Sequence, residues 1–331
     1  MQSLLFQRFP ASSRKGWATS GLHLRFDTVL TKLISFHVVQ FINSPQLFSH
    51  APSDFYNPFI ASFLGYIRAV DATMIVFLEP VPQLSHAVPE LQADKKCAYA
   101  PHWYDLKCLF EKRWSAVMSF DVQALSRGSR NVLKHMYFST TGTKRNYASQ
   151  MSRLFENCSG VPRLIGETGI PMDMNRYFDS ACSTKEPFQT QTQALDCVIT
   201  ACERNLLPYC LWNYTPENIE GKGDFWNRED LSIFSLQNCN NSTYGGGRAL
   251  RAFIRPGAIK VAGTPIKSEF DLLSGLYTLV FIPDETPYLQ SVDSNSLSRQ
   301  TEIFVPKLFT SGDSSHHSFT VSIKCGGAKW E

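Results

Sequence analysis

The residue in this chain best suited to chemistry is Glu167, which stands between two glycines in the segment Arg163–Pro171. The apolar pair Leu164–Ile165 before it is typical of a short buried strand bounded by turn residues. Gly166 and Gly169 let the backbone turn and let a ligand approach closely. Because parallel α/β folds carry their chemistry at the carboxyl ends of strands, we predict a functional carboxylate here. The Gly-Glu-x-Gly pattern alone also fits an ordinary turn.

Other predicted strands also end in ionisable or aromatic residues. Met74–Leu78 precedes Glu79, Cys97–Ala100 leads into His102, Trp103, Tyr104 and Asp105, and the segment from Pro208 ends in Trp212, Asn213 and Tyr214. Apolar residues at helical spacing predict helices near Phe55–Ile67, Arg145–Cys158 and Gln189–Arg204, and Ser115–Lys134 is predicted to be an insertion loop. This alternation of strand and helix is typical of half of a (β/α) barrel.

The pattern changes after Asn238, where short strand-like runs are separated by Pro, Gly and Ser. The expected strands are Ile259–Ala262, Glu269–Leu272, Tyr277–Ile282, Thr301–Val305 and Phe319–Ile323. They predict a small antiparallel, β-sandwich-like domain. We therefore divide the chain into an amino-terminal segment without a clear period (1–54), a barrel half (55–240) and a carboxyl-terminal β-domain (248–331).

Composition narrows the class of protein. The chain is 43% hydrophobic and 18% charged, with a net charge of +3, which favours a globular protein and no nucleic-acid partner. Its nine cysteines show no C-x-x-C spacing, so we expect reduced thiols and no metal site. We find no signal peptide and no apolar run of about 18 residues, so we expect a cytoplasmic protein or one peripheral to intracellular membranes. The 13% aromatic content suits a carbohydrate or lipid site, and an aromatic-rich core equally.

The ordered motifs resemble glycoside hydrolase family 5, and most closely its fungal glucosylceramidase and steryl-β-glucosidase branch, which is related to endoglycoceramidases. The resemblance rests on motifs at 77–82, 100–105, 165–171, 211–214 and 224–232. Arg255–Pro256, 261–265 and 301–306 resemble that branch's carboxyl-terminal β-domain. The resemblance implies a partial (β/α)8 TIM barrel followed by this domain, with no cofactor.

The resemblance also implies roles for individual residues. Glu167 corresponds to the nucleophile, and Trp212, next to Asn213, to the aromatic floor under the sugar ring. His102 and an aromatic partner belong to the preceding strand's motif, where a Tyr hydroxyl contacts the nucleophile; we favour Tyr104 over Trp103. His102 and Trp212 could each be core residues instead. The run Asp224–Asp230 either shapes the aglycone side or is only a charged loop.

The implied activity is hydrolysis of the β-glucoside bond of a glucosylated lipid, such as a steryl glucoside or glucosylceramide, with retention. A retaining glycosidase needs a nucleophile and an acid/base carboxyl about 5 Å apart. A Tyr hydroxyl that donates to the nucleophile favours its ionised form. A Trp ring buries the C–H face of a sugar at little cost in side-chain entropy.

The chain departs from the family at its amino end. A full barrel needs eight βα units in about 250 residues, and only 73 residues precede Met74, the expected fifth strand. The family's acid/base lies in an Asn-Glu-Pro motif, yet no glutamate precedes Glu79. We therefore expect an amino-truncated barrel without its acid/base, with Glu79 as a tentative substitute. The alternative function is an inactive fragment or a sugar-binding pseudoenzyme.

Overall fold

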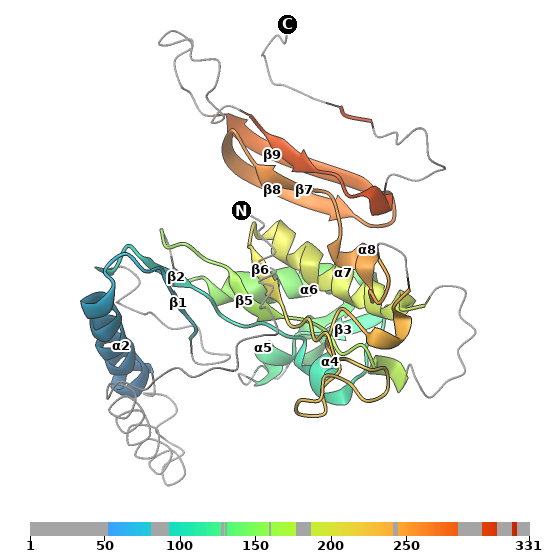
Figure 1. Ribbon diagram of the computed structural model, residues 1–331, viewed down its shortest axis with the longest axis horizontal. Helices are drawn as coiled ribbons and strands as arrows, with labels where there is room; N and C mark the ends of the chain where they lie inside the picture. Colours follow the sequence, from blue (N-terminus) through green and yellow to red (C-terminus); the bar gives the residue numbers. More distant parts are fainter. Residues whose placement is uncertain are drawn as a thin grey trace, which may run out of the picture. The chain divides into compact units, whose positions relative to one another are not determined.

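The computed structural model divides the chain into two compact units, each considered separately below (Figure 1). The larger unit holds His102–Arg153 and the described residues from Ile165 onward, and the smaller unit holds the described residues up to Pro101 together with Leu154–Leu164. The structure describes residues 52–80, 93–126, 129, 131–158, 160–176, 187–240, 244–283, 300–309 and 320–322. The predicted amino-terminal segment 1–54 therefore lies almost wholly outside the described residues.

The smaller unit combines one helix with two parallel strands. A π-helical turn, Pro52–Tyr56, leads into α2 (Asn57–Val70), whose residues Ile60 and Leu64 are buried. β1 (Val76–Leu78) pairs in parallel with β2 (Cys97–Tyr99). The predicted helix and both predicted strands of this region are thus confirmed, each shifted by a few residues.

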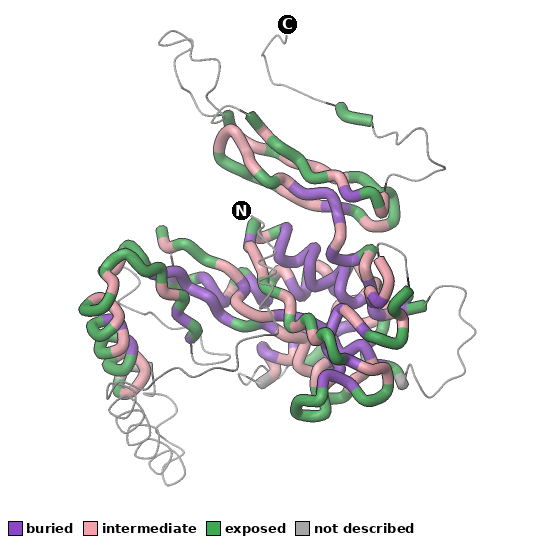
Figure 2. Tube along the Cα trace, in the orientation of Figure 1, coloured by how far each residue is buried: buried purple, intermediate pink, exposed green. Residues whose placement is uncertain are grey.

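The larger unit is organised around a second parallel pair. β5 (Ile165–Thr168) pairs with β6 (Tyr209–Leu211), and two long helices, α6 (Ser139–Leu154) and α7 (Gln189–Arg204), alternate with these strands along the chain. Figure 2 shows α7 buried over most of its length, and its bounds are those predicted from its apolar spacing. The mixed α/β fold is therefore confirmed. Closure of the strands into a barrel, whole or partial, stays a prediction.

The expectation of an insertion loop over Ser115–Lys134 was wrong. After α4 (Leu106–Glu111) the chain forms β3 (Met118–Phe120), α5 (Val122–Ser126) and a 3₁₀ turn, Val132–His135. β3 pairs antiparallel with β4 (Met136–Phe138). Three-residue strands are too short to show a hydrophobic period, so tertiary pairing reveals them where sequence pattern does not.

The chain next forms a 3₁₀ turn, Leu236–Asn238, and a short helix, α8 (Leu250–Phe253). Antiparallel strands come after this helix. β8 (Gly263–Asp271) and β9 (Leu276–Pro283) form an antiparallel hairpin. β7 (Gly257–Lys260) pairs with β10 (Glu302–Phe304). A 3₁₀ turn, Lys307–Phe309, follows β10. The strand expected over Glu269–Leu272 is the end of the longer β8. Of the strand expected over Phe319–Ile323, the structure describes 320–322, and these three residues are not in a strand.

A buried charge cluster ties α7 to β8. Arg255 is 4% exposed and forms ion pairs with Asp196 and, at 3.2 Å, with Glu203. Glu203 also accepts a hydrogen bond from the backbone N–H of Phe270 in β8, and Lys144 contacts Asp196 at 2.7 Å. Burial raises the pKa of Glu203, and the charge of Arg255 offsets part of that rise. The cluster stabilises the packing of the β-strands on the helix only while every charge has its partner.

Replacing Arg255 with Leu should therefore lower the free energy of unfolding at pH 7 by about 3–5 kcal/mol, because Glu203 keeps a buried, uncompensated charge. Arg204→Leu, which removes the more exposed pair with Glu269, should cost about 1 kcal/mol or less. In Arg255→Leu, Glu203 binds a proton more readily in the folded state than in the unfolded state. The loss of unfolding free energy in this variant should therefore shrink from pH 7 to pH 5. Urea unfolding followed by circular dichroism measures these free energies. Equal losses in the two variants at pH 7, or a loss in Arg255→Leu that is as large or larger at pH 5, would contradict the account.

Candidate active site

Glu167 lies within β5, with its carboxylate about one quarter exposed (26%). Its backbone carbonyl accepts a hydrogen bond from the N–H of Trp103, and a parallel bridge joins His102 to Glu167. The Tyr104 hydroxyl donates to Glu167 Oε1 at 2.8 Å, and His102 Nδ1 lies 3.5 Å from the same oxygen. The structure thus brings three of the predicted site residues together.

Tyr104 is held in its protonated form. Burial, and then the hydrogen bond to Glu167, raise the pKa of Tyr104 well above its usual value. A phenol that stays protonated remains a hydrogen-bond donor at every physiological pH, so the Tyr104 hydroxyl can donate to Glu167 throughout that range.

Trp103 does not belong to this cluster. Its side chain is 1% exposed and packs on the ring of Tyr147, with ring centroids 4.8 Å apart. Successive residues of an extended segment point to opposite sides, so Tyr104 faces Glu167 while Trp103 enters the core. The preference for Tyr104 agrees with this geometry, and the structure places Trp103 away from the proposed sugar.

Trp212 follows β6 and is 37% exposed. Its backbone N–H donates to the carbonyl of Thr168 at 2.8 Å, which continues the pairing of β6 with β5. At Gly169 a side-chain Cβ would lie 2.2 Å from the carbonyl oxygen of Trp212. The close approach that this glycine permits is therefore to the neighbouring strand, a correction to the expectation that it admits a ligand.

The other two predicted residues are placed differently. Asn213 is partly buried; its side-chain oxygen accepts from the Thr215 hydroxyl at 3.2 Å, and its carbonyl accepts from the N–H of Ile233. These bonds fix the chain after β6. Glu79 belongs to the smaller unit, directly after β1, where its carbonyl accepts from the Tyr56 hydroxyl. The role of Glu79 stays a prediction.

Three of the predicted site residues, Tyr104, Glu167 and Trp212, line a cleft of about 220 Å³ together with Leu109, Trp226, Glu229 and Leu231. Two carboxylates, two indoles and a phenol thus share one small space. Sequence reasoning noticed the run that contains Trp226 and Glu229 but did not single out either residue. The available signal was their residue type, an indole and a carboxylate within a motif of the family.

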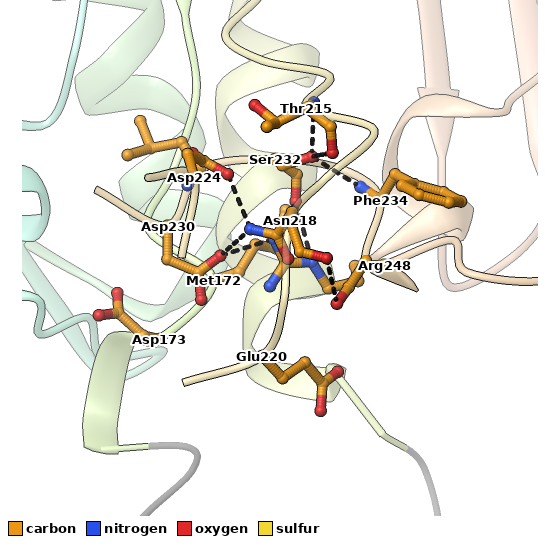
Figure 3. A network of polar contacts seen from close by, with 12 residues as sticks. Met172, Asp173, Thr215, Asn218, Glu220, Asp224, Asp230, Ser232, Phe234 and Arg248 are labelled. Atoms are coloured by element: carbon orange, nitrogen blue, oxygen red, sulfur yellow. Dashed lines mark hydrogen bonds and ion pairs between the residues drawn. The ribbon is translucent and has the colours of Figure 1, made fainter. Parts of the chain in front are cut away.

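A buried polar network anchors that run (Figure 3). The side-chain amide of Asn218 donates to Asp224 at 2.7 Å and to Asp230 at 2.9 Å, so one residue joins the two ends. Asp230 also pairs at 2.7 Å with Arg248, which is fully buried. Asp224 accepts from the backbone N–H of Leu231 at 2.8 Å. The ends of the segment between Asp224 and Asp230 are therefore fixed, and we call this segment the cleft loop.

Neither a metal site nor a membrane-spanning helix is found in the part of the chain that the structure describes. Within the described residues, no group of three or more His, Cys, Asp or Glu side chains is arranged to hold a metal ion. Of the helices that the structure describes, none is both long and apolar enough to cross a bilayer.

Comparison with known proteins identifies the family. The model of the glycoside hydrolase family 5 C-terminal domain matches residues 255–331. A glucosylceramidase of Rhizopus delemar is 35% identical over 273 residues, which are 76% of this chain and 38% of that protein. The chain belongs to glycoside hydrolase family 5. This confirms the resemblance inferred from the motifs.

Other relatives place the chain in the fungal glucosylceramidase and steryl-glucosidase branch of the family. An ergosteryl-beta-glucosidase of Saccharomyces cerevisiae is 28% identical over 192 residues, 54% of this chain and 24% of the relative. The crystal structure of Cryptococcus neoformans sterylglucosidase 1 superposes with a TM-score of 0.62 at 25% identity, covering 67% of this chain and 34% of that one. The matched part of the chain thus spans between about a quarter and two fifths of the length of these relatives.

Gly169→Ala tests the constraint on which this site is built. The added methyl group meets backbone rather than a mobile side chain, so β5 and β6 must separate, and we expect a loss of about 1–3 kcal/mol in the free energy of unfolding. Gly65→Ala in α2 is the control, because its Cβ meets nothing within 4 Å and should raise stability by about 0.5–1 kcal/mol. Urea unfolding compares the two; an unchanged Gly169→Ala would contradict the tight strand contact.

Proposed function

We propose that this chain carries the nucleophile side of a retaining β-glucosidase site that acts on a glucosylated lipid. The observation that carries the proposal is the 2.8 Å hydrogen bond from Tyr104 to Glu167 in a cleft that also exposes Trp212. A carboxylate oriented by a hydrogen-bond donor and placed beside an exposed indole is the combination that glycosyl transfer to an enzyme requires.

In this mechanism the Glu167 carboxylate attacks the anomeric carbon while the bond from that carbon to the aglycone oxygen breaks, and the aglycone leaves with a proton from an acid or from water. Water later hydrolyses the glycosyl-enzyme ester. Tyr104 donates to Oε1 and so orients the carboxylate, leaving Oε2 as the attacking atom. His102, whose Nδ1 lies 3.5 Å from Oε1, is a second group that holds the carboxylate in place. The indole of Trp212 supports the apolar face of the sugar ring.

The substrate class follows from what the relatives share. A glucosylceramidase and an ergosteryl-beta-glucosidase are both similar to this chain, and both names join glucose to a hydrophobic aglycone. We propose a steryl glucoside or glucosylceramide as the substrate. Such a lipid resides in a membrane, so we also propose that the protein works in the cytoplasm, at the surface of intracellular membranes.

A second candidate function is sugar binding without turnover. It is favoured by one observation: the described lining of the cleft holds two carboxyl groups, the proposed nucleophile Glu167 and Glu229, and Glu229 already bonds to the Trp212 indole. General acid help to the leaving group is worth about 10²–10⁴-fold in rate, so a site without it would bind a lipid glucoside but hydrolyse little of it.

Trapping with 2,4-dinitrophenyl 2-deoxy-2-fluoro-β-glucoside tests the assigned nucleophile. The dinitrophenolate departs without a proton, and the fluorine slows hydrolysis of the ester, so the glycosyl-enzyme should accumulate even without an acid/base. Mass spectrometry of peptides should locate one fluoroglucosyl group on Glu167 and none in Glu167→Gln.

A label on another residue, or no label, would contradict the assignment of Glu167. A labelled Glu167 in a chain that releases no sterol from steryl glucoside would favour the second candidate function. Release of sterol at a rate lost in Glu167→Gln would favour the first.

A further inference from the structure

We propose that Glu229 is a sugar-recognition residue, whose carboxylate accepts hydrogen bonds from hydroxyl groups of the glucose ring stacked on Trp212. This inference rests on the proposed function, since it requires that the cleft bind a glucoside. It adds a specificity determinant on the cleft loop. The role of this residue is to recognise the sugar, whereas the proposed role of Glu167 on β5 is nucleophilic attack.

The contacts of Glu229 leave it available for a ligand. Trp212 Nε1 donates to Glu229 Oε2 at 3.3 Å, which fixes the carboxylate at the edge of the indole. An ionised carboxylate offers about four acceptor positions, and this bond uses one. Sugar hydroxyls are donors, so an anchored carboxylate next to an exposed indole matches a sugar at both its polar edge and its apolar face.

The backbone that presents Glu229 is strained. Phe225, Asn227 and Arg228 have φ values of 58°, 47° and 60°, in the left-handed region that non-glycine residues avoid. At Gly223, where φ is 74°, a Cβ would lie 2.1 Å from the carbonyl oxygen of Glu229. Such conformations persist only where the surroundings enforce them, and they concentrate at ligand-binding sites.

The surroundings enforce this loop from three directions. Asn218 joins Asp224 to Asp230, and the fully buried Arg248 holds Asp230 (Figure 3). On the other side Lys112, which pairs with Asp173, donates to the carbonyl of Arg228 at 3.2 Å. The loop is therefore a rigid support, and the residues that it directs into the cleft are Trp226 and Glu229.

A merely structural Glu229 would serve only to orient Trp212. The two roles differ in whether the protein senses a particular sugar hydroxyl through Glu229. Saturation-transfer NMR titrations with methyl β-D-glucopyranoside and its 2-, 3-, 4- and 6-deoxy analogues measure this directly. The proteins to compare are the full chain, Glu229→Ala, Glu229→Gln, Trp212→Ala and a control, Glu217→Ala, whose exposed residue lies outside the cleft.

We expect at least one deoxy analogue to bind the full chain about tenfold more weakly than the parent glucoside, because a hydrogen bond to a charged group is lost. That penalty should disappear in Glu229→Ala and shrink in Glu229→Gln, which keeps one acceptor for the indole. Glu217→Ala should keep the full pattern.

Glu229→Ala with the same penalties as the full chain would overturn the inference. If Trp212→Ala also bound as the full chain does, or if the full chain bound no glucoside, the proposed function would fail as well. Loss of binding in Trp212→Ala alongside an unchanged Glu229→Ala would overturn only the role of Glu229.

Discussion

The site depends on how closely two parallel strands approach at their carboxyl ends. Thr168 accepts a hydrogen bond from the N–H of Trp212, and Gly169 leaves room for the Trp212 carbonyl. Any side chain at that glycine would separate the strands, and a separation there would carry the indole away from Glu167. The glycine that looks like a ligand-binding feature in sequence is thus a packing requirement, and Glu167 and Trp212 are positioned by one backbone contact.

Buried charges hold the cleft loop and the antiparallel strands, which do not pair with β5 or β6. Arg248 and Asn218 hold the ends of the cleft loop, while Arg255 binds α7 to the antiparallel strands. Each buried cation is matched by carboxylates, because an unmatched charge in such surroundings would cost several kcal/mol. In the cleft, Glu167 accepts a hydrogen bond from Tyr104 and Glu229 accepts one from Trp212, and we propose that a bound sugar adds further donors and an apolar face to these contacts.

Much of this arrangement follows from sequence. The apolar spacing of α7, the short run before Glu167 and the aromatic end of β6 each appear where local pattern predicts them, and parallel pairing then brings Glu167 and Trp212 to one edge. The preference for Tyr104 over Trp103 rests on the family resemblance, and alternation along the extended segment accounts for it in the structure. These features are local, or depend on a pairing rule that is general.

The remainder depends on contacts between distant residues. β3 and β4 are three residues each and carry no readable period. Glu229 reaches the cleft only because Asn218, Arg248 and Lys112 impose left-handed conformations on the loop, and no spacing along the chain encodes that geometry. The steric need for Gly169 likewise depends on a distant residue, because the Trp212 carbonyl that crowds it follows β6.

The central claim is that Glu167, Trp212 and Glu229 surround one sugar ring. A crystal structure of the chain soaked in methyl β-D-glucopyranoside tests it most directly. The account predicts a glucoside stacked on the Trp212 indole, with its anomeric carbon facing the Glu167 carboxylate and ring hydroxyls within hydrogen-bond distance of Glu229. A sugar bound elsewhere, or Glu167 and Trp212 found at opposite ends of the strand pair, would contradict it.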